Sequence, residues 1–448
     1  MEWLTIIERV VAFVSALLAI LQLLPSQRSA SRKRFNLFTA LLVSVLITTP
    51  VMIVTPVGQQ FELQAFDQMI RWRQDEGPDK RLLIVTVTPE DIQYQKEREW
   101  DPGAKSLSDP ALVEVLDKLN NSKPVAIGLD IFRDFPAQDE NLKVQLAQNK
   151  SLIVVCKIKE EGNNSNSTGI EPPPEIQDKK RIGFADFPQD SGGVIRRQLL
   201  AMSIPENSPC SSYSLSLRVA IRYLSYLEEE GIQNINIEFD DQGNLKINEV
   251  LFSKLDKDAG GYHLPEEESR GYQILLNYRS PQKIAETITL TELLDGTLDS
   301  KLAELVKDKI VLIGNDAAEV GYGGMHFTPY NEEIPAVMIH GQMISQILSA
   351  VLNGRTLLWW WPQAVENLWV WGWSFIGGIL GICLIRRVFT RWLIWITVAA
   401  VPFTLWRICF LVFVERGGWL PLVPSILGFL LTGIAMIVYY QIIIESRR

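Results

Sequence analysis

Long apolar segments at the two ends of the chain constrain its fold more than any other feature of the sequence. Residues 35–55 carry no charge and are long enough to cross a bilayer. Near the other end, residues 364–385, 392–414 and 420–444 form three further apolar segments in close succession. These segments predict one transmembrane helix before a large central region and three transmembrane helices after it.

The first apolar segment, residues 3–24, allows two interpretations. Glu8 and Arg9 interrupt its first part, and the rest is apolar. Charges near the end of a span are tolerated, and such a helix can also lie in the membrane interface, so both arrangements stay open. A cleaved signal peptide fits poorly, because no small-residue cleavage site follows Leu24 and a predicted span comes next.

Basic clusters predict the orientation of the chain in the membrane. Residues 28–34 are rich in Arg and Lys, whereas residues 56–60 are uncharged, and further basic clusters lie at 386–391 and 447–448. The positive-inside rule places all of these clusters in the cytoplasm. We therefore expect a multi-pass protein of the plasma (inner) membrane, with residues 59–356 extracytoplasmic and the C-terminus cytoplasmic.

Two ionisable residues interrupt the C-terminal segments. Arg407 lies within the middle segment, and Glu366 lies near the start of the segment before it. Because an ionisable residue in the membrane needs a partner or must reach the interface, we predict a Glu366–Arg407 ion pair, with a snorkelling arginine as the alternative. Either arrangement favours a structural role over a transport pathway.

The central region alternates between two kinds of pattern. Short β-branched apolar runs predict buried strands, and amphipathic patterns between them predict helices, the first with Asp109 as its N-cap. This alternation favours an α/β fold, with a mainly parallel or mixed sheet flanked by helices in an extracytoplasmic domain, plus transmembrane α-helices. The strand-like runs are residues 82–87, 124–131, 152–156 and 309–314. The predicted plan is an apolar helix at 1–27, a basic linker and transmembrane helix at 28–58, the extracytoplasmic domain at 59–356, and three transmembrane helices with a short cytoplasmic tail at 357–448.

The sequence contains no recognised catalytic motif, and we predict no catalytic residue, cofactor or metal site. There is no nucleophile elbow, zinc-protease motif or phosphate-binding loop. The chain has only three histidines, and the pair His326 and His340 flanks a turn, which is more typical of structural hydrogen bonding than of metal binding. The net charge of -9 argues against a nucleic-acid partner.

Polar residues near the ends of predicted strands are the candidate ligand-binding residues, because ligands of open α/β sheets bind beyond the carboxyl ends of the strands. The alternative is that these residues cap helices or face solvent. The candidates are Thr88, Asp130, Arg133, Asn277, Asn315 and His340.

Two of the four cysteines, Cys156 and Cys210, lie in the central region. A disulfide between them is permitted if the region is extracytoplasmic. Two free buried thiols are the alternative, and the spacing does not choose between them.

A set of short motifs runs through the chain in a fixed order. They are residues 66–73 (FDQMIRWR), 126–132 (AIGLDIF), 183–186 (GFAD) with 194–197 (VIRR), 275–279 (LLNYR), 309–314 (KIVLIG), 327–330 (FTPY) with 339–342 (IHGQ), and 419–424 (WLPLVP). With these motifs and its membrane plan, the sequence resembles the CHASE sensory domain of type two. Gly324-Met325 stands where the family often has an acidic residue before its Thr-Pro turn, and Ala336 stands where it often has Gly.

The resemblance implies an extracellular sensor of the kind found ahead of kinases and cyclases in bacteria, notably cyanobacteria. It also implies an unknown extracytoplasmic ligand and a tendency to form homodimers. Sensors of this family usually continue into a cytoplasmic output domain, whereas this sequence ends four residues after its last predicted span. We therefore expect a stand-alone sensor that signals through a separate kinase, cyclase or phosphatase. The alternative is a structural scaffold subunit of a membrane complex without ligand sensing.

Overall fold

The computed structural model describes residues 56–100, 106–159, 169–279, 283–316, 324–385 and 391–441, together with the single positions 39, 41, 43 and 45. The chain forms two compact units. The helical unit comprises Met1–Met69, Asp256–Glu266 and Leu358–Arg448, and the α/β unit comprises Ile70–Leu255 and Glu267–Leu357. The expected helix at 3–24, the basic residues 28–34, 386–390 and 447–448, and most of the predicted span at 35–55 lie outside the described residues.

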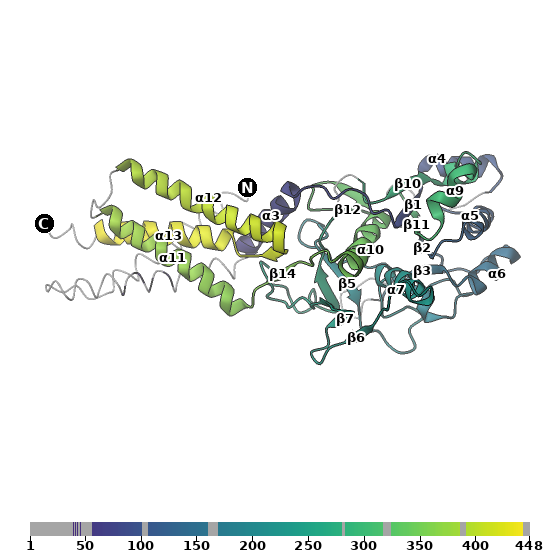
Figure 1. The fold of residues 1–448 in the computed structure, drawn as a ribbon, viewed down its shortest axis with the longest axis horizontal. Helices are drawn as coiled ribbons and strands as arrows, with labels where there is room; N and C mark the ends of the chain where they lie inside the picture. The colour runs from purple at the N-terminus through teal and green to yellow at the C-terminus, as the bar shows by residue number, and fades with distance from the viewer. Residues whose placement is uncertain are drawn as a thin grey trace. The chain divides into compact units, whose positions relative to one another are not determined.

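The α/β unit is built on a six-stranded sheet with the strand order β10-β1-β11-β2-β3-β4 (Figure 1). Every neighbouring pair of strands in this sheet is parallel. The predicted α/β fold with a mainly parallel sheet is therefore confirmed. The strands are β1 (Leu82–Val87), β2 (Ala126–Asp130), β3 (Leu152–Cys156), β4 (Ile182–Phe184), β10 (Glu286–Thr289) and β11 (Ile310–Asn315).

Helices cover both faces of this sheet, which explains why its strands read as continuous apolar runs. On one face, Leu83 and Val85 of β1 pack with side chains of several short helices. On the other face, Leu82 and Ile84 pack with two longer helices. The first face is covered by α4 (Pro89–Glu97), α5 (Asp109–Asn121), α6 (Glu140–Gln148), α8 (Leu290–Leu294) and α9 (Asp299–Val306), and the second by α7 (Leu215–Glu229) and α10 (Ala336–Asn353).

The start of α5 differs by one residue from the prediction. Ser108, and not Asp109, is the N-cap, and its hydroxyl accepts a hydrogen bond from the Ala111 amide at 3.4 Å. Both residue types cap helices well, so composition alone could not choose between them. As the first residue of the helix, Asp109 is free to bind other groups with its carboxylate.

Cys156 and Cys210 form a disulfide, with their Cα atoms 5.6 Å apart. Of the two readings that the sequence left open, the structure thus shows the disulfide. It joins the end of β3 to the segment that precedes α7.

Smaller sheets complete the α/β unit. They are β5 (Arg197–Ala201) with β9 (Tyr272–Leu275), the three strands β6 (Ile237–Phe239), β7 (Leu245–Ile247) and β8 (Val250–Phe252), and β12 (Met325–Phe327) with β13 (Glu333–Pro335), all antiparallel. A short 3₁₀ helix, η1, spans Lys179–Arg181.

The helical unit contains three helices that are long and apolar enough to cross a membrane. They are α11 (Gln363–Ile385), α12 (Arg391–Arg416) and α13 (Val423–Tyr440). A short bridge between β14 (Trp359–Trp360) and β15 (Gly418–Trp419) lies beside them. The helix α3 (Pro56–Trp72) begins in this unit, and its last residues, after Met69, belong to the α/β unit.

Glycines allow α11 and α13 to pack closely. A Cβ atom on Gly377 would lie 2.0 Å from the Phe429 carbonyl oxygen, and one on Gly381 would lie 2.5 Å from the Gly433 carbonyl oxygen. No side chain fits at either position, so the backbones of the two helices touch along this face.

Candidate functional site

Asp130 and His340 form a buried pair at the carboxyl end of the central strands. Asp130 is the last residue of β2 and lies opposite Gly314 of β11. His340 lies in the second turn of α10, and its Nε2 atom is 3.7 Å from the Asp130 Oδ1 atom. Gly314 makes this approach possible, because a Cβ atom there would lie 2.6 Å from the Val337 side chain.

Burial shifts the pKa values of both members of the pair toward their neutral forms. It raises the pKa of Asp130 to about 8 and, with a smaller contribution from His326, lowers the pKa of His340 to about 3. Neither ring nitrogen of His340 has a hydrogen-bond partner among the described residues. Near neutral pH the pair is therefore a carboxylic acid beside a neutral imidazole.

Aromatic rings lead from the surface toward this pair. The Phe187 ring lies 4.7 Å from the His340 ring and 5.2 Å from the His326 ring, measured between ring centroids. The exposed Gln189 contacts His326 Nδ1 at 3.2 Å. Phe187 thus contacts both the half-buried His326 and the His340 ring of the buried pair.

The other predicted strand-end residues lie elsewhere. Thr88 is the N-cap of α4, and its hydroxyl and amide exchange hydrogen bonds with Asp91. Asn315 follows Gly314, whose Cα faces Val337 of α10, so the alternation of the strand turns the Asn315 side chain to the opposite face of the sheet. Its Oδ1 atom is buried there without a hydrogen-bond partner in the described structure.

Arg133 is buried in a structural network. Its guanidinium forms an ion pair with Asp109, donates a hydrogen bond to the Leu107 carbonyl at 3.2 Å, and lies over the Phe135 ring. These contacts tie the segment after β2 to the start of α5. The structure therefore does not gather Asp130, Arg133 and His340 around one pocket.

Asn277 lies in a cluster that joins the entry and exit of the α/β unit. The guanidinium of Arg73, just after α3, donates to the Asn277 side-chain oxygen, and the Asn277 side-chain amide donates to the Thr356 carbonyl at 2.9 Å. Arg355 donates to the Asn277 carbonyl at 2.9 Å and forms an ion pair with Glu76 at 2.6 Å. We call Arg73, Glu76, Asn277 and Arg355 the junction cluster.

The helix α10 connects the buried pair of Asp130 and His340, which we call the strand-end pair, to the junction cluster. It carries His340 near its start, and the Gln346 side chain accepts a hydrogen bond from the Asn277 amide. The helix ends at Asn353, and its cap residue Gly354 has a left-handed conformation and is followed by Arg355. One helix therefore contacts Asp130 near one end and holds the junction cluster at the other.

In the helical unit, Trp419 anchors the segment at residues 256–266. Its ring lies 4.7 Å from Phe66 and 5.6 Å from Tyr262, and its Nε1 donates to Glu62 at 3.1 Å. A Cβ atom on Gly260 would lie 2.5 Å from the Trp419 ring, so only glycine lets the segment lie against it. This segment leaves the α/β unit between β8 and β9 and packs with the helices.

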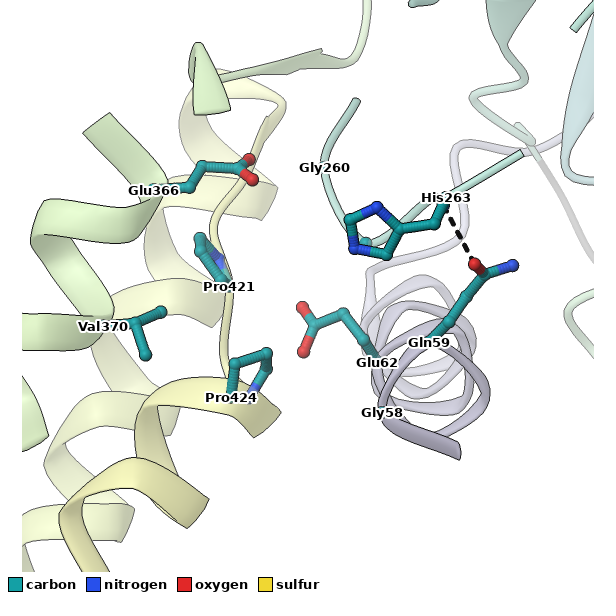
Figure 2. Close-up of a pocket in the computed structure, with 10 residues that line it drawn as sticks. Gly58, Gln59, Glu62, Gly260, His263, Glu366, Val370, Pro421 and Pro424 are labelled. Carbon is teal, nitrogen blue, oxygen red and sulfur yellow. Dashed lines mark hydrogen bonds between the residues drawn. The ribbon is translucent and has the colours of Figure 1, made fainter. Parts of the chain in front are cut away.

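Glu62 borders a small cavity in the helical unit (Figure 2). Its carboxylate also accepts hydrogen bonds from the Leu422 and Val423 amides at 3.1 Å and 2.7 Å, at the start of α13. Burial nevertheless raises the pKa of Glu62 to about 7. The cavity, of about 20 Å³, is also lined by His263 and Glu366 and has room for about one water molecule.

The structure does not bring Glu366 and Arg407 together. Glu366 is buried, and its Oε1 atom has no hydrogen-bond partner among the described residues. Arg407 is exposed on α12, where its guanidinium lies 5.7 Å from the centre of the Trp406 ring. The predicted ion pair thus has no counterpart in the described part of the chain.

Metal-ligand clusters are also absent from the described residues, where no three His, Cys, Asp or Glu side chains gather in a suitable way. His263, which lines the cavity beside Glu62, contacts Asp258 through its Nδ1 atom at 3.1 Å.

The sequence did not indicate three of the four residues in the junction cluster. Arg73, Glu76 and Arg355 lie far from Asn277 in the sequence, and no motif joins them. The one available signal was position, because Arg73 and Arg355 lie just inside the two ends of the central region. No sequence pattern indicated that Phe187 contacts His326 and His340.

Comparison with known protein families gives one match, to the CHASE2 domain over residues 38–379. No curated protein and no solved structure matches the chain significantly. CHASE2 domains are extracellular and sensory rather than catalytic. Together with the three helices able to cross a membrane, the match identifies a membrane protein with an extracytoplasmic region. Because the match covers more than half of its length, the chain belongs to the CHASE2 family of sensory domains.

Proposed function

We propose that the α/β unit senses a ligand or condition outside the cytoplasm and that the chain passes this state to a separate signalling protein at the membrane. The junction cluster is the observation that carries the proposal. It ties the chain that enters the unit through α3 to the chain that leaves it toward α11. A change that reaches this cluster acts on both connections at once.

The helix α10 is the proposed route from the sensing end to the junction cluster. Its 18 residues span about 27 Å at the usual helical rise. A shift at His340 would therefore move Gln346 and the end of the helix, to which Gly354 and Arg355 are directly joined. The ligand must bind two arrangements of this helix with different affinity, because only a differential affinity can shift a conformational equilibrium.

A structural scaffold is the second candidate function, and one observation favours it. The Asp130 and His340 side chains are buried, and the predicted ligand-binding residues are spread over several places in the α/β unit. A ligand pocket would gather several polar groups around one cavity. A scaffold would use the same buried pair only for packing.

Mild cross-linking of the full-length protein in its native membranes, followed by purification and mass spectrometry, separates the two functions. The sensor proposal predicts recovery of a kinase, cyclase or phosphatase. An Arg355→Ala variant should recover the same enzyme but change its activity, because the link between α10 and Glu76 is lost. Recovery of a stable membrane complex without a signalling enzyme, or of this chain alone, would reject the sensor and favour the scaffold.

A further inference from the structure

Arg407 lies within a helix that is apolar enough to cross a membrane. The apolar sequence of α12 runs over residues 392–414, and Arg407 is seven residues before its C-terminal end. At the helical rise this places its Cα about 10 Å from that end of the span. The side chain is exposed on the helix surface.

A charge at this depth requires compensation. A guanidinium inside the hydrocarbon costs several kcal/mol unless it is paired, hydrated or reaches the interface. No ion pair of Arg407 exists within the described residues, where its guanidinium lies over the ring of the neighbouring Trp406 on the same helix. Among the described residues the arginine therefore lacks an acidic partner.

The exposed residues around Arg407 form a stripe along α12. Ile396, Phe403, Leu411 and Val414 are between 39% and 62% exposed. Together with Ala400 and Arg407, they recur at intervals of three and four residues, which places them on one face of the helix. This is the spacing with which one helix packs against another. We call these six residues the α12 stripe.

The α12 helix is also the least covered of the three apolar helices. Only 17% of its apolar span is buried, compared with 44% of the span in α13. An apolar stripe alone would suit lipid. The arginine within the span makes lipid a poor neighbour and makes an acidic helix a good one.

We propose that the α12 stripe binds a transmembrane helix of the signalling partner that carries an aspartate or glutamate at the membrane depth of Arg407. This inference rests on the proposed function, since it describes how the separate partner is held. A second copy of this chain fits less well. In a symmetric pair the same stripe would face itself, and the two Arg407 side chains would repel each other.

Site-specific photo-cross-linking tests the surface. A photo-reactive amino acid replaces Leu411 in the stripe, and a matched control replaces Ile376 on α11, which is 41% exposed compared with 42% for Leu411. Both are made in the full-length chain and irradiated in native membranes. We expect position 411, but not 376, to capture a different protein through a peptide that contains a membrane-embedded carboxylate.

Substitutions at Arg407 then test the charge. Arg407→Leu should lower the yield at position 411 on the order of threefold to tenfold, as expected for one polar contact between membrane helices. Arg407→Lys keeps the charge and should keep most of the yield. Since Leu suits a membrane helix, loss of yield at 411 with an unchanged pattern at 376 reports lost docking and not misfolding.

Four results would overturn the inference: capture of lipid only, of a second copy, of this chain's own N-terminal residues, or of a peptide without a carboxylate. An undiminished yield in Arg407→Leu would do the same. If a signalling enzyme still co-purifies in any of these cases, the sensor proposal stands and only the docking surface is wrong.

Discussion

The Asp130–His340 pair makes the stability of the fold depend on pH. In the unfolded chain the two groups titrate near pH 3.9 and 6.5. In the folded chain burial moves the pKa of Asp130 to about 8 and that of His340 to about 3. The folded pair therefore holds one proton from about pH 3 to about pH 8.

The pair lowers the stability of the fold both as the pH rises above about 6.5 and as it falls below about 4. Between about pH 4 and 6.5 the unfolded chain also holds one proton, so the pair adds no slope. Above 6.5 the unfolded chain releases it while the folded chain keeps it until about 8, so stability falls as pH rises. Below about 4 the unfolded chain binds a second proton first, so stability falls as pH falls.

We predict that the free energy of unfolding drops by about 1 to 2 kcal/mol between pH 6.5 and 8 because of Asp130. Asp130→Asn should remove this drop, since the amide cannot ionise. Chemical denaturation of the full-length protein at several pH values measures it. Asp134→Asn, at an exposed position, is the control and should keep the wild-type slope. An unchanged slope in Asp130→Asn would show that the carboxyl is already ionised in the folded chain.

At the scale of secondary-structure elements, the junction cluster holds the end of α3 to the end of α10. The Arg355 guanidinium contacts Glu76 and the carbonyls of Asn277 and Tyr278. Burial opposes the ionised form of Glu76, but the Arg355 guanidinium prevails and lowers the pKa of this carboxyl. The contact is therefore charged near neutral pH.

Arg355→Ala should destabilise the α/β unit by about 1 to 3 kcal/mol, because the part-buried Asn277 carbonyl loses its donor and Glu76 loses its closest cation. Arg98→Ala is the matched control. Arg98 also forms an ion pair, with Glu114, but both side chains are more than 30% exposed, so its removal should cost less than about 1 kcal/mol. Thermal unfolding of both variants makes the comparison, and equal losses would contradict a special role for the junction.

The close packing of α11 on α13 gives a second prediction at this scale. Gly381→Leu should separate the two helices and lower the yield of folded protein, since the new side chain meets the Gly433 backbone. Gly372→Leu, on the same helix, meets no atom within 4 Å and should be tolerated. Size-exclusion profiles in detergent distinguish the two. Normal behaviour of Gly381→Leu would mean that the helices do not touch there.

The disulfide ties β3 to the segment before α7. It closes a loop of 54 residues, so replacing both cysteines with serine should cost about 2 to 4 kcal/mol. Cys383→Ser, which removes a free thiol, serves as the control. Denaturant midpoints with and without reductant report the difference, and an unaffected double variant would argue that the bond contributes nothing to stability.

At the scale of the whole molecule, local patterns predicted the architecture well. The runs at β1, β2, β3 and β11 are apolar on both faces, and this pattern occurs in parallel sheets covered by helices. The apolar C-terminal segments also predicted the three long helices. Both kinds of prediction succeed because the apolar pattern of each element lies within one continuous stretch of chain.

The sequence predicted the candidate site only in part. Asp130 and His340 are both among the predicted ligand-binding residues, but their contact joins residues far apart in the chain, and only the packing of α10 shows it. Thr88 and Arg133 proved to cap a helix and to bind Asp109. From the sequence alone, a polar residue after a strand that binds a ligand cannot be distinguished from one that caps a helix or forms an ion pair. The attachment of residues 256–266 to the helices depends on Trp419, which no local pattern could indicate.

The central claim is that the state of the strand-end pair reaches the junction cluster through α10. Hydrogen exchange of the full-length protein in lipid nanodiscs tests it, by comparing wild type with Asp130→Asn at pH 6 and at pH 9. Comparison at equal pH cancels the intrinsic exchange rates. We predict similar protection at pH 6, and at pH 9 a loss in wild type that extends along α10 to residues 353–357 and to residues 73–77. A difference at pH 9 confined to the neighbours of Asp130 would contradict the account.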